Sequence, residues 1–371
     1  MSDVNKILKS ISNSKNLNPS NEITFIDLFC GCGGISQGFI DAGYKLLLGI
    51  DHDQPSLDTF NENFGLDKGI KLDLFKDDYI ETIKKRIKSK KIDVIVAGPP
   101  CQGFSLTGPR KFDDPRNQLY LSVFKTVETF KPRAFLIENV KGMKTLYKGE
   151  VLKEVVHRFE KLGYKVTTPK ILLAADYAVP QMRERLFIVG VRDEFEEFDF
   201  PKPVTEKNKI SCSDAISDLP SREKDFGKEL DSYLSKPNSD YQRFMRSNTK
   251  DLHNHVATNH TELVKSVIRQ VPEGKNYKAL PPGVGESRKF NEAWTRYHSQ
   301  KPSRTIDTGH RNHFHYKWDR VPTVRENARL QSFRDDFIFV GPRTQQNKQV
   351  GNAVPPLLAF FLAKQIREII E

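Results

Sequence analysis

Two consecutive prolines interrupt an apolar run and constrain how this part of the chain can fold. Residues 92–96 predict a buried strand, and Pro99 and Pro100 cannot continue it because each lacks a backbone N–H and has a fixed φ. The chain therefore leaves the sheet here and places Cys101 just beyond the sheet edge, before a polar loop over residues 102–116. A thiol at the carboxyl end of an α/β strand, beside a loop that can cover it, is typical of a nucleophile. For a cysteine taken by itself, a small apolar role at a strand end is the alternative.

A strand, a glycine turn and a helix follow one another near the N-terminus. Residues 23–29 predict a buried strand, residues 30–34 are Cys-Gly-Cys-Gly-Gly, and residues 35–42 have helical spacing. Such a unit opens nucleotide-binding α/β sheets, because glycines let the backbone approach a ligand and the helix N-terminus favours an anion. The glycines lack Gly-x-Gly-x-x-Gly spacing, which disfavours a nicotinamide oxidoreductase. The carboxylate of a methionine moiety would fit, and a tight connection without a ligand is the alternative.

Acidic residues end the next two predicted strands. Asp51 follows the strand over residues 45–50 and lies 20 residues after Gly31, about where an acid binds a ribose diol. The alternative for Asp51 is the N-cap of the following helix. Asp73 lies in the strand predicted over residues 70–74, and its carboxylate could accept a hydrogen bond from an adenine amino group.

Polar residues also lie at the ends of two later strands. Residues 134–137 predict a strand that leads to Glu138, and an apolar setting can raise the pKa of such a carboxyl so that it donates a proton. Arg183 and Arg185 alternate at the start of the strand predicted over residues 185–190, so we expect them to share a strand face. Two guanidinium groups on one face suit a phosphate or a base carbonyl. A capping or salt-bridged acid and a surface ion pair are the respective alternatives.

Strands and helices alternate as far as residue 203, which predicts a mostly parallel sheet with helices on both faces. The other elements expected are helices over residues 118–130, 151–162, 324–331 and 357–370 and one strand over residues 164–173. The last helix is apolar and needs a partner, so we expect the C-terminus to return to the early sheet.

Charge points to a polyanionic partner. The net charge is +11, and residues 243–320 alone hold 15 Lys/Arg against 7 Asp/Glu. Because aromatic side chains are interleaved with these cations, the segment is typical of a nucleic-acid surface.

Neither a disulfide framework nor a metal site is expected. The chain has only four cysteines, and the pair Cys30 and Cys32 lacks a second pair at ligand spacing. Three histidines between residues 310 and 315 lack a cysteine or acid at such spacing, so polar contacts or packing are expected for them. No apolar run of about 18 residues is present, so a cytoplasmic protein without a membrane partner is expected.

Taken together, these segments resemble the DNA (cytosine-5)-methyltransferase family over nearly the whole chain and in the family's order. The segments that carry the resemblance are residues 27–34, 98–105, 138–140, 181–185, 325–333 and 349–354. The resemblance implies a doubly wound, mostly parallel sheet of the class I S-adenosylmethionine-dependent methyltransferase fold, with a smaller target-recognition domain. The implied division is residues 1–203 completed by 344–371 for catalysis and cofactor binding, and residues 204–343 for recognition.

The resemblance also implies a role for individual residues. S-adenosylmethionine would be the methyl donor, without a metal, and Asp51 and His52 stand where the family often has Glu and Trp. The implied cofactor pocket comprises Phe29, Gly31, Cys32, Gly33, Gly34, Asp51, His52, Asp73, Leu74, Pro100, Leu119 and Asn352. The implied catalytic residues are Cys101, Glu138, Asn139, Arg183 and Arg185.

The implied reaction is methylation of carbon 5 of a cytosine turned out of duplex DNA, after Cys101 adds to the ring. Methylation of a transfer RNA and a catalytically inactive DNA-binding regulator are the alternatives. Ser105 and the long basic insert favour DNA over RNA, and the presence of Cys101 and Glu138 disfavours an inactive site. The expected setting is a bacterial, monomeric enzyme in the cytoplasm, associated with the nucleoid. It would be either a restriction-modification enzyme with a functionally paired restriction endonuclease or an orphan modification enzyme.

Overall fold

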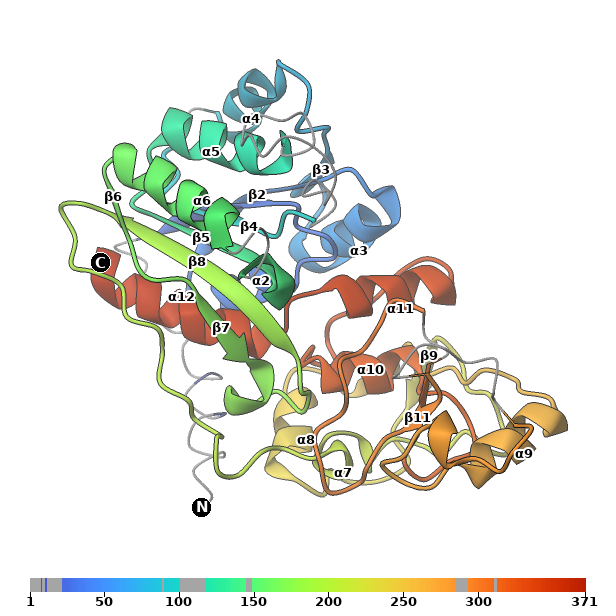
Figure 1. The fold of residues 1–371 in the computed structure, drawn as a ribbon. Coiled ribbons are helices and arrows are strands. Elements are labelled where there is room, and N and C mark those ends of the chain that lie inside the picture. The colour runs from blue at the N-terminus through green and yellow to red at the C-terminus, as the bar shows by residue number, and fades with distance from the viewer. Residues whose placement is uncertain are drawn as a thin grey trace. The chain divides into compact units, whose positions relative to one another are not determined.

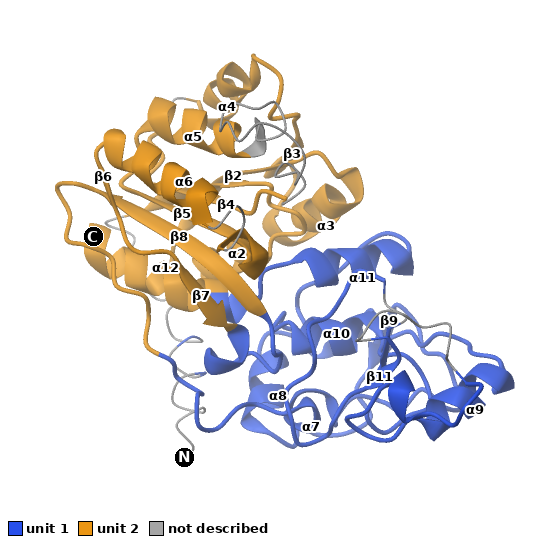
Figure 2. Cartoon of the chain, viewed as in Figure 1, with its two compact units in different colours: residues 1–13, 174–183, 203–358 blue, residues 14–173, 184–202, 359–371 orange. Residues whose placement is uncertain are grey.

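The computed structural model describes residues 8, 11, 22–88, 90–100, 118–144, 149–284, 293–309 and 312–371. The chain divides into two compact units (Figure 2). The sheet unit comprises residues 14–173, 184–202 and 359–371, and the second unit comprises residues 1–13, 174–183 and 203–358. The boundaries differ from the expected division because residues 1–13, 174–183, 203 and 344–358 fall in the second unit.

One eight-stranded sheet forms the centre of the sheet unit (Figure 1). Its strands are β1 (Thr24–Leu28), β2 (Lys45–Asp51), β3 (Gly69–Lys71), β4 (Val94–Ala97), β5 (Ala134–Val140), β6 (Tyr164–Val166), β7 (Lys170–Leu173) and β8 (Glu184–Arg192). The order is β3-β2-β1-β4-β5-β8-β6, with β7 also paired to β8. Strands β1 to β5 pair in parallel, and β8 pairs antiparallel with β5, β6 and β7. The predicted mostly parallel, doubly wound sheet is confirmed, and its strand order reverses between β1 and β4, where such sheets bind ligands.

Helices cover both faces of the sheet. They are α2 (Gly34–Asp41), α3 (Gln54–Phe64), α4 (Tyr79–Ile87), α5 (Gln118–Phe130), α6 (Glu150–Lys161) and α12 (Pro356–Ile370). Figure 1 shows α4, α5 and α6 over one face and α2 and α12 over the other. Side chains alternate accordingly: Phe135 of β5 packs on Phe159 of α6 with ring centroids 4.2 Å apart, and Phe25 of β1 packs on Phe39 of α2 at 5.3 Å.

The last helix belongs to the sheet unit from residue 359 onward. The Tyr44 hydroxyl donates a hydrogen bond of 2.9 Å to the Ala363 carbonyl, and Arg367 donates to the Gly43 carbonyl at 2.9 Å. Both contacts join the C-terminal helix to the start of β2.

The single strand expected over residues 164–173 is instead two strands, β6 and β7. Pro169 lies between them, and a proline cannot donate a hydrogen bond to a sheet ladder. The two strands consequently pair with different parts of β8, β6 with residues 190–192 and β7 with residues 184–187. The third strand is also shorter than expected, because β3 ends at Lys71 and leaves Asp73 beyond it.

The second unit contains short elements. They are α7 (Cys212–Ile216), β9 (Leu230–Ser232), α8 (Asp240–Met245), β10 (Asp251–His253), α9 (Glu262–Gln270), β11 (Thr295–Arg296), β12 (His313–Phe314), α10 (Val324–Leu330) and α11 (Arg343–Asn352). Residues 174–183 join this unit although they lie between β7 and β8 in sequence. Gln181 forms a parallel bridge with Ser303, and its side-chain oxygen accepts from the Ile306 N–H at 3.1 Å.

Helix α10 is the buried centre of the second unit, since all seven of its residues are buried. Thr323 caps it, accepting from the Glu326 N–H while the Glu326 carboxylate accepts from the Thr323 N–H. Glu326 also accepts two hydrogen bonds from Arg320, at 2.6 and 2.7 Å. Burial would raise the pKa of Glu326, but the Arg320 guanidinium outweighs it and holds that pKa well below its usual range.

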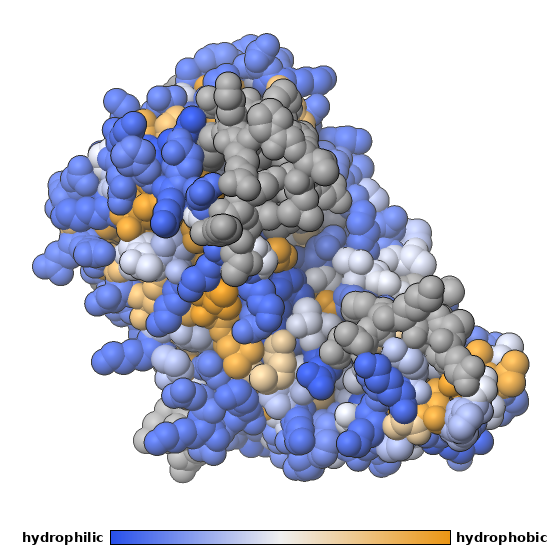
Figure 3. Space-filling view, in the orientation of Figure 1, coloured by the Kyte–Doolittle hydropathy of each residue, from blue (hydrophilic) through white to orange (hydrophobic). Residues whose placement is uncertain are grey.

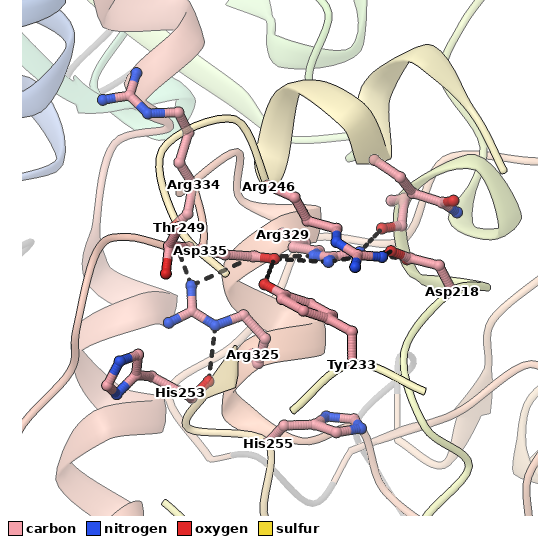
Figure 4. Close-up of polar contacts among 12 residues, drawn as sticks. Asp218, Tyr233, Arg246, Thr249, His253, His255, Arg325, Arg329, Arg334 and Asp335 are labelled. Atoms are coloured by element: carbon pink, nitrogen blue, oxygen red, sulfur yellow. Dashed lines mark hydrogen bonds and ion pairs between the residues drawn. The ribbon is translucent and has the colours of Figure 1, made fainter. Parts of the chain in front are cut away.

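A buried arginine network surrounds α10 (Figure 4). Arg329 contacts Asp335 at 2.7 Å and Asp218 at 2.5 Å, and all three side chains are fully buried. Arg325 lies 3.7 Å from Asp335, and Arg246 lies 3.1 Å from Asp218. We call these five residues the arginine network. Asp218 is 111 residues from Arg329 in sequence, so the network joins distant segments of the unit.

Candidate functional site

The expected cofactor-pocket residues of the sheet unit gather at one edge of the sheet. Phe29 follows β1, Asp51 ends β2, Asp73 and Leu74 follow β3, and Pro100 follows β4. Because these strands are parallel, their carboxyl ends share an edge, and that edge includes the reversal point between β1 and β4. Cys101 and the Leu119 side chain lie outside the described residues, and Asn352 belongs to the second unit as the last residue of α11.

The glycine turn has a left-handed backbone at three positions. Phe29, Gly31 and Gly33 have φ values of 59°, 53° and 98°. Among the described residues, a Cβ added at Gly31 would meet no atom within 4 Å, so open space lies beside Gly31 there, whereas one added at Gly33 would lie 2.2 Å from the Phe64 ring. Gly33 therefore permits close packing against α3, and Gly31 leaves room for a ligand. Gly34 then begins α2.

Asp51 is held by backbone donors of the turn and of its own segment. It accepts hydrogen bonds from the N–H groups of Gly31 at 2.8 Å, His52 at 2.7 Å and Asp53 at 2.9 Å. It is not the N-cap of α3, because Asp53 holds that position and accepts from the Ser56 N–H at 3.1 Å. A carboxylate has about four acceptor positions, so about one remains for a ligand.

The other pocket residues vary in exposure. His52 has a side chain that is 78% exposed, with its Nδ1 3.3 Å from Asp51. Asp73 is exposed and accepts from the Phe75 N–H at 3.0 Å, whereas the adjacent Leu74 is buried. Cys32 is buried, and burial raises the pKa of its thiol, as it does for Cys30. Neither thiol is therefore prepared to react as a thiolate.

Asp27 is a residue of this site that the sequence reasoning missed. It is fully buried in β1 and accepts a hydrogen bond of 2.7 Å from the Ser36 hydroxyl of α2. Burial raises its pKa to about 7. The sequence does contain an indication of it, because Asp27 is an acid inside the apolar run of residues 23–29. Packing alone does not explain a carboxyl group at a buried position of a strand.

Glu138 and Asn139 lie within β5 and contact the segment that leads to Cys101. The Glu138 carboxylate is 2.8 Å from Arg185 Nε, and both side chains are largely buried. A Cβ added at Gly98 would lie 3.7 Å from Glu138 Oε2. The Asn139 amide donates to the Pro99 carbonyl at 3.1 Å and to the Tyr120 hydroxyl at 2.8 Å. An acid and an amide thus flank the two residues that precede Pro100.

Arg183 does not share a strand face with Arg185, so that prediction was wrong. Strand β8 begins at Glu184, and the Arg183 N–H donates to the Gln181 carbonyl at 2.9 Å, which makes a tight turn before the strand. Arg183 belongs to the second unit and is buried there, with Nη1 3.5 Å from the Ile306 carbonyl.

Basic side chains of the second unit line two hollows that share Gly274, Thr295 and Arg304. The first, of about 380 Å³, is also lined by Lys275, Asn276, Lys278 and Ala279. The second, of about 290 Å³, is also lined by Met182, Arg296, Tyr297, His298, Lys301 and Pro302. On the face shown in Figure 3 the surface is largely hydrophilic. Not all cations of residues 243–320 can contact a nucleic acid, because Arg296 and Arg320 are buried.

The described part of the chain carries neither a candidate metal cluster nor a candidate membrane span. It contains no group of three or more His, Cys, Asp or Glu side chains that could hold a metal ion. Within the same residues, no helix combines the length and apolarity needed to cross a bilayer.

The sheet, its order and the turn after β1 define a doubly wound α/β protein of the class I S-adenosylmethionine-dependent methyltransferase fold. The chain belongs to the C-5 cytosine-specific DNA methylase family, whose profile matches residues 23–368. The resemblance is thereby confirmed, and the chain is a DNA (cytosine-5)-methyltransferase. These matches favour DNA methylation over the RNA and non-catalytic alternatives.

Individual relatives support the same family, and solved structures support the same fold. Type II methyltransferase M1.HphI of Haemophilus parahaemolyticus is 38% identical over 354 residues, covering 93% of this chain and 86% of the relative. Type II methyltransferase M.DdeI of Desulfomicrobium norvegicum is 36% identical over 370 residues, covering 93% and 88%. A crystal structure described as a DNA modification methyltransferase encoded within an E. coli prophage is 26% identical with a TM-score of 0.76, covering 94% of this chain and 99% of that chain. S. pombe Dnmt2 methyltransferase, at 16% identity and a TM-score of 0.59 over 94% and 99% of the two chains, shares the fold.

Proposed function

We propose that Cys101 is the nucleophile and Glu138 the proton-holding acid of cytosine methylation. Carbon 5 of cytosine is a weak nucleophile by itself. The Cys101 thiolate forms a bond to carbon 6 while Glu138 gives its proton to ring nitrogen 3, so that the adduct is a neutral enamine with electron density at carbon 5. After methylation, a base removes the carbon 5 proton, the sulfur–carbon bond breaks, and nitrogen 3 returns its proton to Glu138.

The contacts around Glu138 carry this proposal. Its carboxylate lies beside Gly98, three residues before Cys101, and Asn139 holds the Pro99 carbonyl of the same segment. Arg185 orients the carboxylate through the contact of 2.8 Å and, with Asn139 and Arg183, would position the base. A cytosine must leave the duplex stack to reach such a residue.

S-adenosylmethionine fits the turn after β1. Bound there, it supplies the electrophilic methyl group that carbon 5 accepts. The open space at Gly31 and the remaining acceptor position of Asp51 suit a nucleoside with a ribose diol. Phe29, His52, Asp73, Leu74, Pro100, Leu119 and Asn352 would complete the pocket, and no metal takes part.

Duplex DNA would bind the basic hollows of the second unit. Lys275, Lys278, Lys301 and Arg304 line them, and cations of this kind neutralise phosphates. Because the relatives above are named Type II methyltransferases, we further propose that the enzyme acts as a monomer in the bacterial cytoplasm and protects DNA from a paired restriction endonuclease.

The deciding experiment traps the adduct. Bisulfite sequencing of DNA from expressing cells first gives the target site. A duplex carrying 5-fluorocytosine at that site is then incubated with the protein and S-adenosylmethionine, since fluorine cannot leave as the proton does. We expect a covalent complex on a denaturing gel with the wild type, slower formation with Glu138→Gln and none with Cys101→Ser. An adduct that persists in Cys101→Ser would overturn the assignment of the nucleophile.

A further inference from the structure

A second kind of hollow opens in the second unit where β9, α8 and the residues before β10 meet. Its volume is about 420 Å³. It is lined by Ser232, Tyr233, Pro237, Arg243, Arg246, Thr249 and Lys250. None of these residues lines the two hollows already described, and none belongs to the implied cofactor or catalytic set.

One residue in the wall of this hollow, Arg246, belongs to the arginine network, and that network is not electrically neutral. It contains three arginines and two aspartates, which leaves one positive charge in excess. The four members other than Arg246 are completely buried, whereas the Arg246 side chain is 17% exposed. Buried charges are costly unless they are paired. An anion would therefore compensate the excess positive charge best where the network reaches solvent, which is at Arg246.

Arg246 is held in place but retains free donors. Its Nη1 donates to Asp218 at 3.1 Å and to the Ser235 carbonyl at 2.9 Å, and its guanidinium stacks 3.6 Å from the centre of the Tyr233 ring. The Tyr233 hydroxyl in turn donates to Asp335 at 2.5 Å, so the stack is anchored at both ends (Figure 4). A guanidinium has five N–H donors, and those on Nε and Nη2 have no partner among the described residues.

Lys250 adds a second excess charge at the same hollow. It is exposed, and no carboxylate of the described residues pairs with it. Arg243 is paired with Asp240 and so adds donors but little net charge. Ser232 and Thr249 complete the polar lining. A fixed planar guanidinium and an ammonium beside one concavity match the oxygens of a phosphate.

We infer that this hollow binds a backbone phosphate of the DNA substrate, as a contact that adds affinity without reading sequence. The inference rests on the proposed function, because the polyanion is the DNA that the enzyme methylates. A free inorganic phosphate has the same chemistry, so the test must separate the two sources.

The test measures how duplex affinity depends on salt. Each phosphate neutralised by a protein cation contributes about 0.9 to the slope of log K against log salt concentration. We expect Lys250→Gln to reduce the magnitude of the slope for a short mixed-sequence duplex by about 0.9, and Lys250→Arg to restore it. Lys224→Gln is the matched control, because it removes an equal exposed charge from the same unit at a residue that lines none of the three hollows.

Each outcome decides the inference. Equal slopes for Lys250→Gln and Lys224→Gln overturn it, while methylation detected by bisulfite sequencing shows that the proposed function itself still holds. If inorganic phosphate shifts the backbone NMR signals of Thr249 and Lys250 but the duplex slope does not change, the hollow takes a small anion and the DNA contact is refuted. A slope reduced only by Lys250→Gln supports the contact. Absence of methylation by the wild type would instead count against the proposed function.

Discussion

Replacing Asp335 by Asn should destabilise the second unit strongly. The Asp335 carboxylate is fully buried and accepts from Arg329 at 2.7 and 2.9 Å and from the Tyr233 hydroxyl at 2.5 Å. Burial would raise the pKa of Asp335, but the Arg329 guanidinium outweighs it and keeps that pKa below its usual value, so the native group is charged. An uncharged amide leaves three arginines facing one aspartate, and removing one partner of a buried ion pair costs about 3–5 kcal/mol.

Urea unfolding followed by tryptophan fluorescence measures the free energy of unfolding of the second unit. The chain has two tryptophans, Trp294 and Trp318, and both lie in the second unit. Asp336→Asn is the matched control, because the neighbouring carboxylate is partly exposed and pairs with Arg334 at 3.4 Å. We expect the control to cost at most about 1 kcal/mol. If Asp335→Asn lowered the free energy of unfolding by no more than Asp336→Asn, the view that the arginine network is a stabilising, fully charged cluster would be refuted.

Three further predictions concern pH, the cofactor and the glycine turn. Burial lowers the pKa of His255 to about 4 and that of His315 to about 3, below the value of 6.5 in an unfolded chain, so these histidines stabilise the fold fully above pH 6.5 and progressively less as the pH falls towards 4. Urea titrations at pH 7 and pH 5 should show the loss, and equal stabilities would contradict it. Asp51→Ala should weaken S-adenosylmethionine binding about 10- to 100-fold by calorimetry, because a hydrogen bond to a charged group contributes about 1.5–3 kcal/mol; unchanged affinity would remove Asp51 from the pocket. Gly33→Ala should destabilise the sheet unit by more than about 1 kcal/mol, since its φ of 98° is unfavourable for alanine and the methyl group meets Phe64. Hydrogen exchange in β1 and α3 at wild-type rates would argue against that.

Local sequence patterns predicted the sheet well, because a strand that is buried on both faces appears in the sequence as a continuous apolar run. The apolar runs that became β2, β4 and β5 each pair in parallel, and Asp51, Pro100 and Glu138 lie at the carboxyl-end edge of the sheet. The glycine turn was equally visible, since a left-handed backbone at Gly31 and Gly33 favours that residue type. Pro169 also gave a local signal for the break between β6 and β7, which the single-strand prediction overlooked.

The sequence could not show which arginines are buried, because their burial depends on partners that are distant in the chain or cannot be told from local patterns. Arg296 and Arg320 contribute to the basic charge of residues 243–320 but are buried, because Asp319 and Glu326 pair with them. Charge counting treats such arginines as surface, since it contains no information on which carboxylate meets which guanidinium. Arg183 was misplaced for a related reason, because its position depends on contacts of residues 180–183 with residues more than a hundred positions later.

The interleaved chain path limits how the second unit could be exchanged between enzymes of this family. A graft of residues 203–358 alone would leave the host's own residues 174–183 in place. In this protein the Pro180 carbonyl accepts from the Ser303 N–H at 2.9 Å, the Met182 N–H donates to the Ser303 carbonyl at 2.8 Å, and the Gln181 amide reaches the Leu330 carbonyl at 3.2 Å. A chimera must therefore transplant the ten-residue segment together with the long one, or else leave the contacts of residues 180–182 mismatched in the second unit.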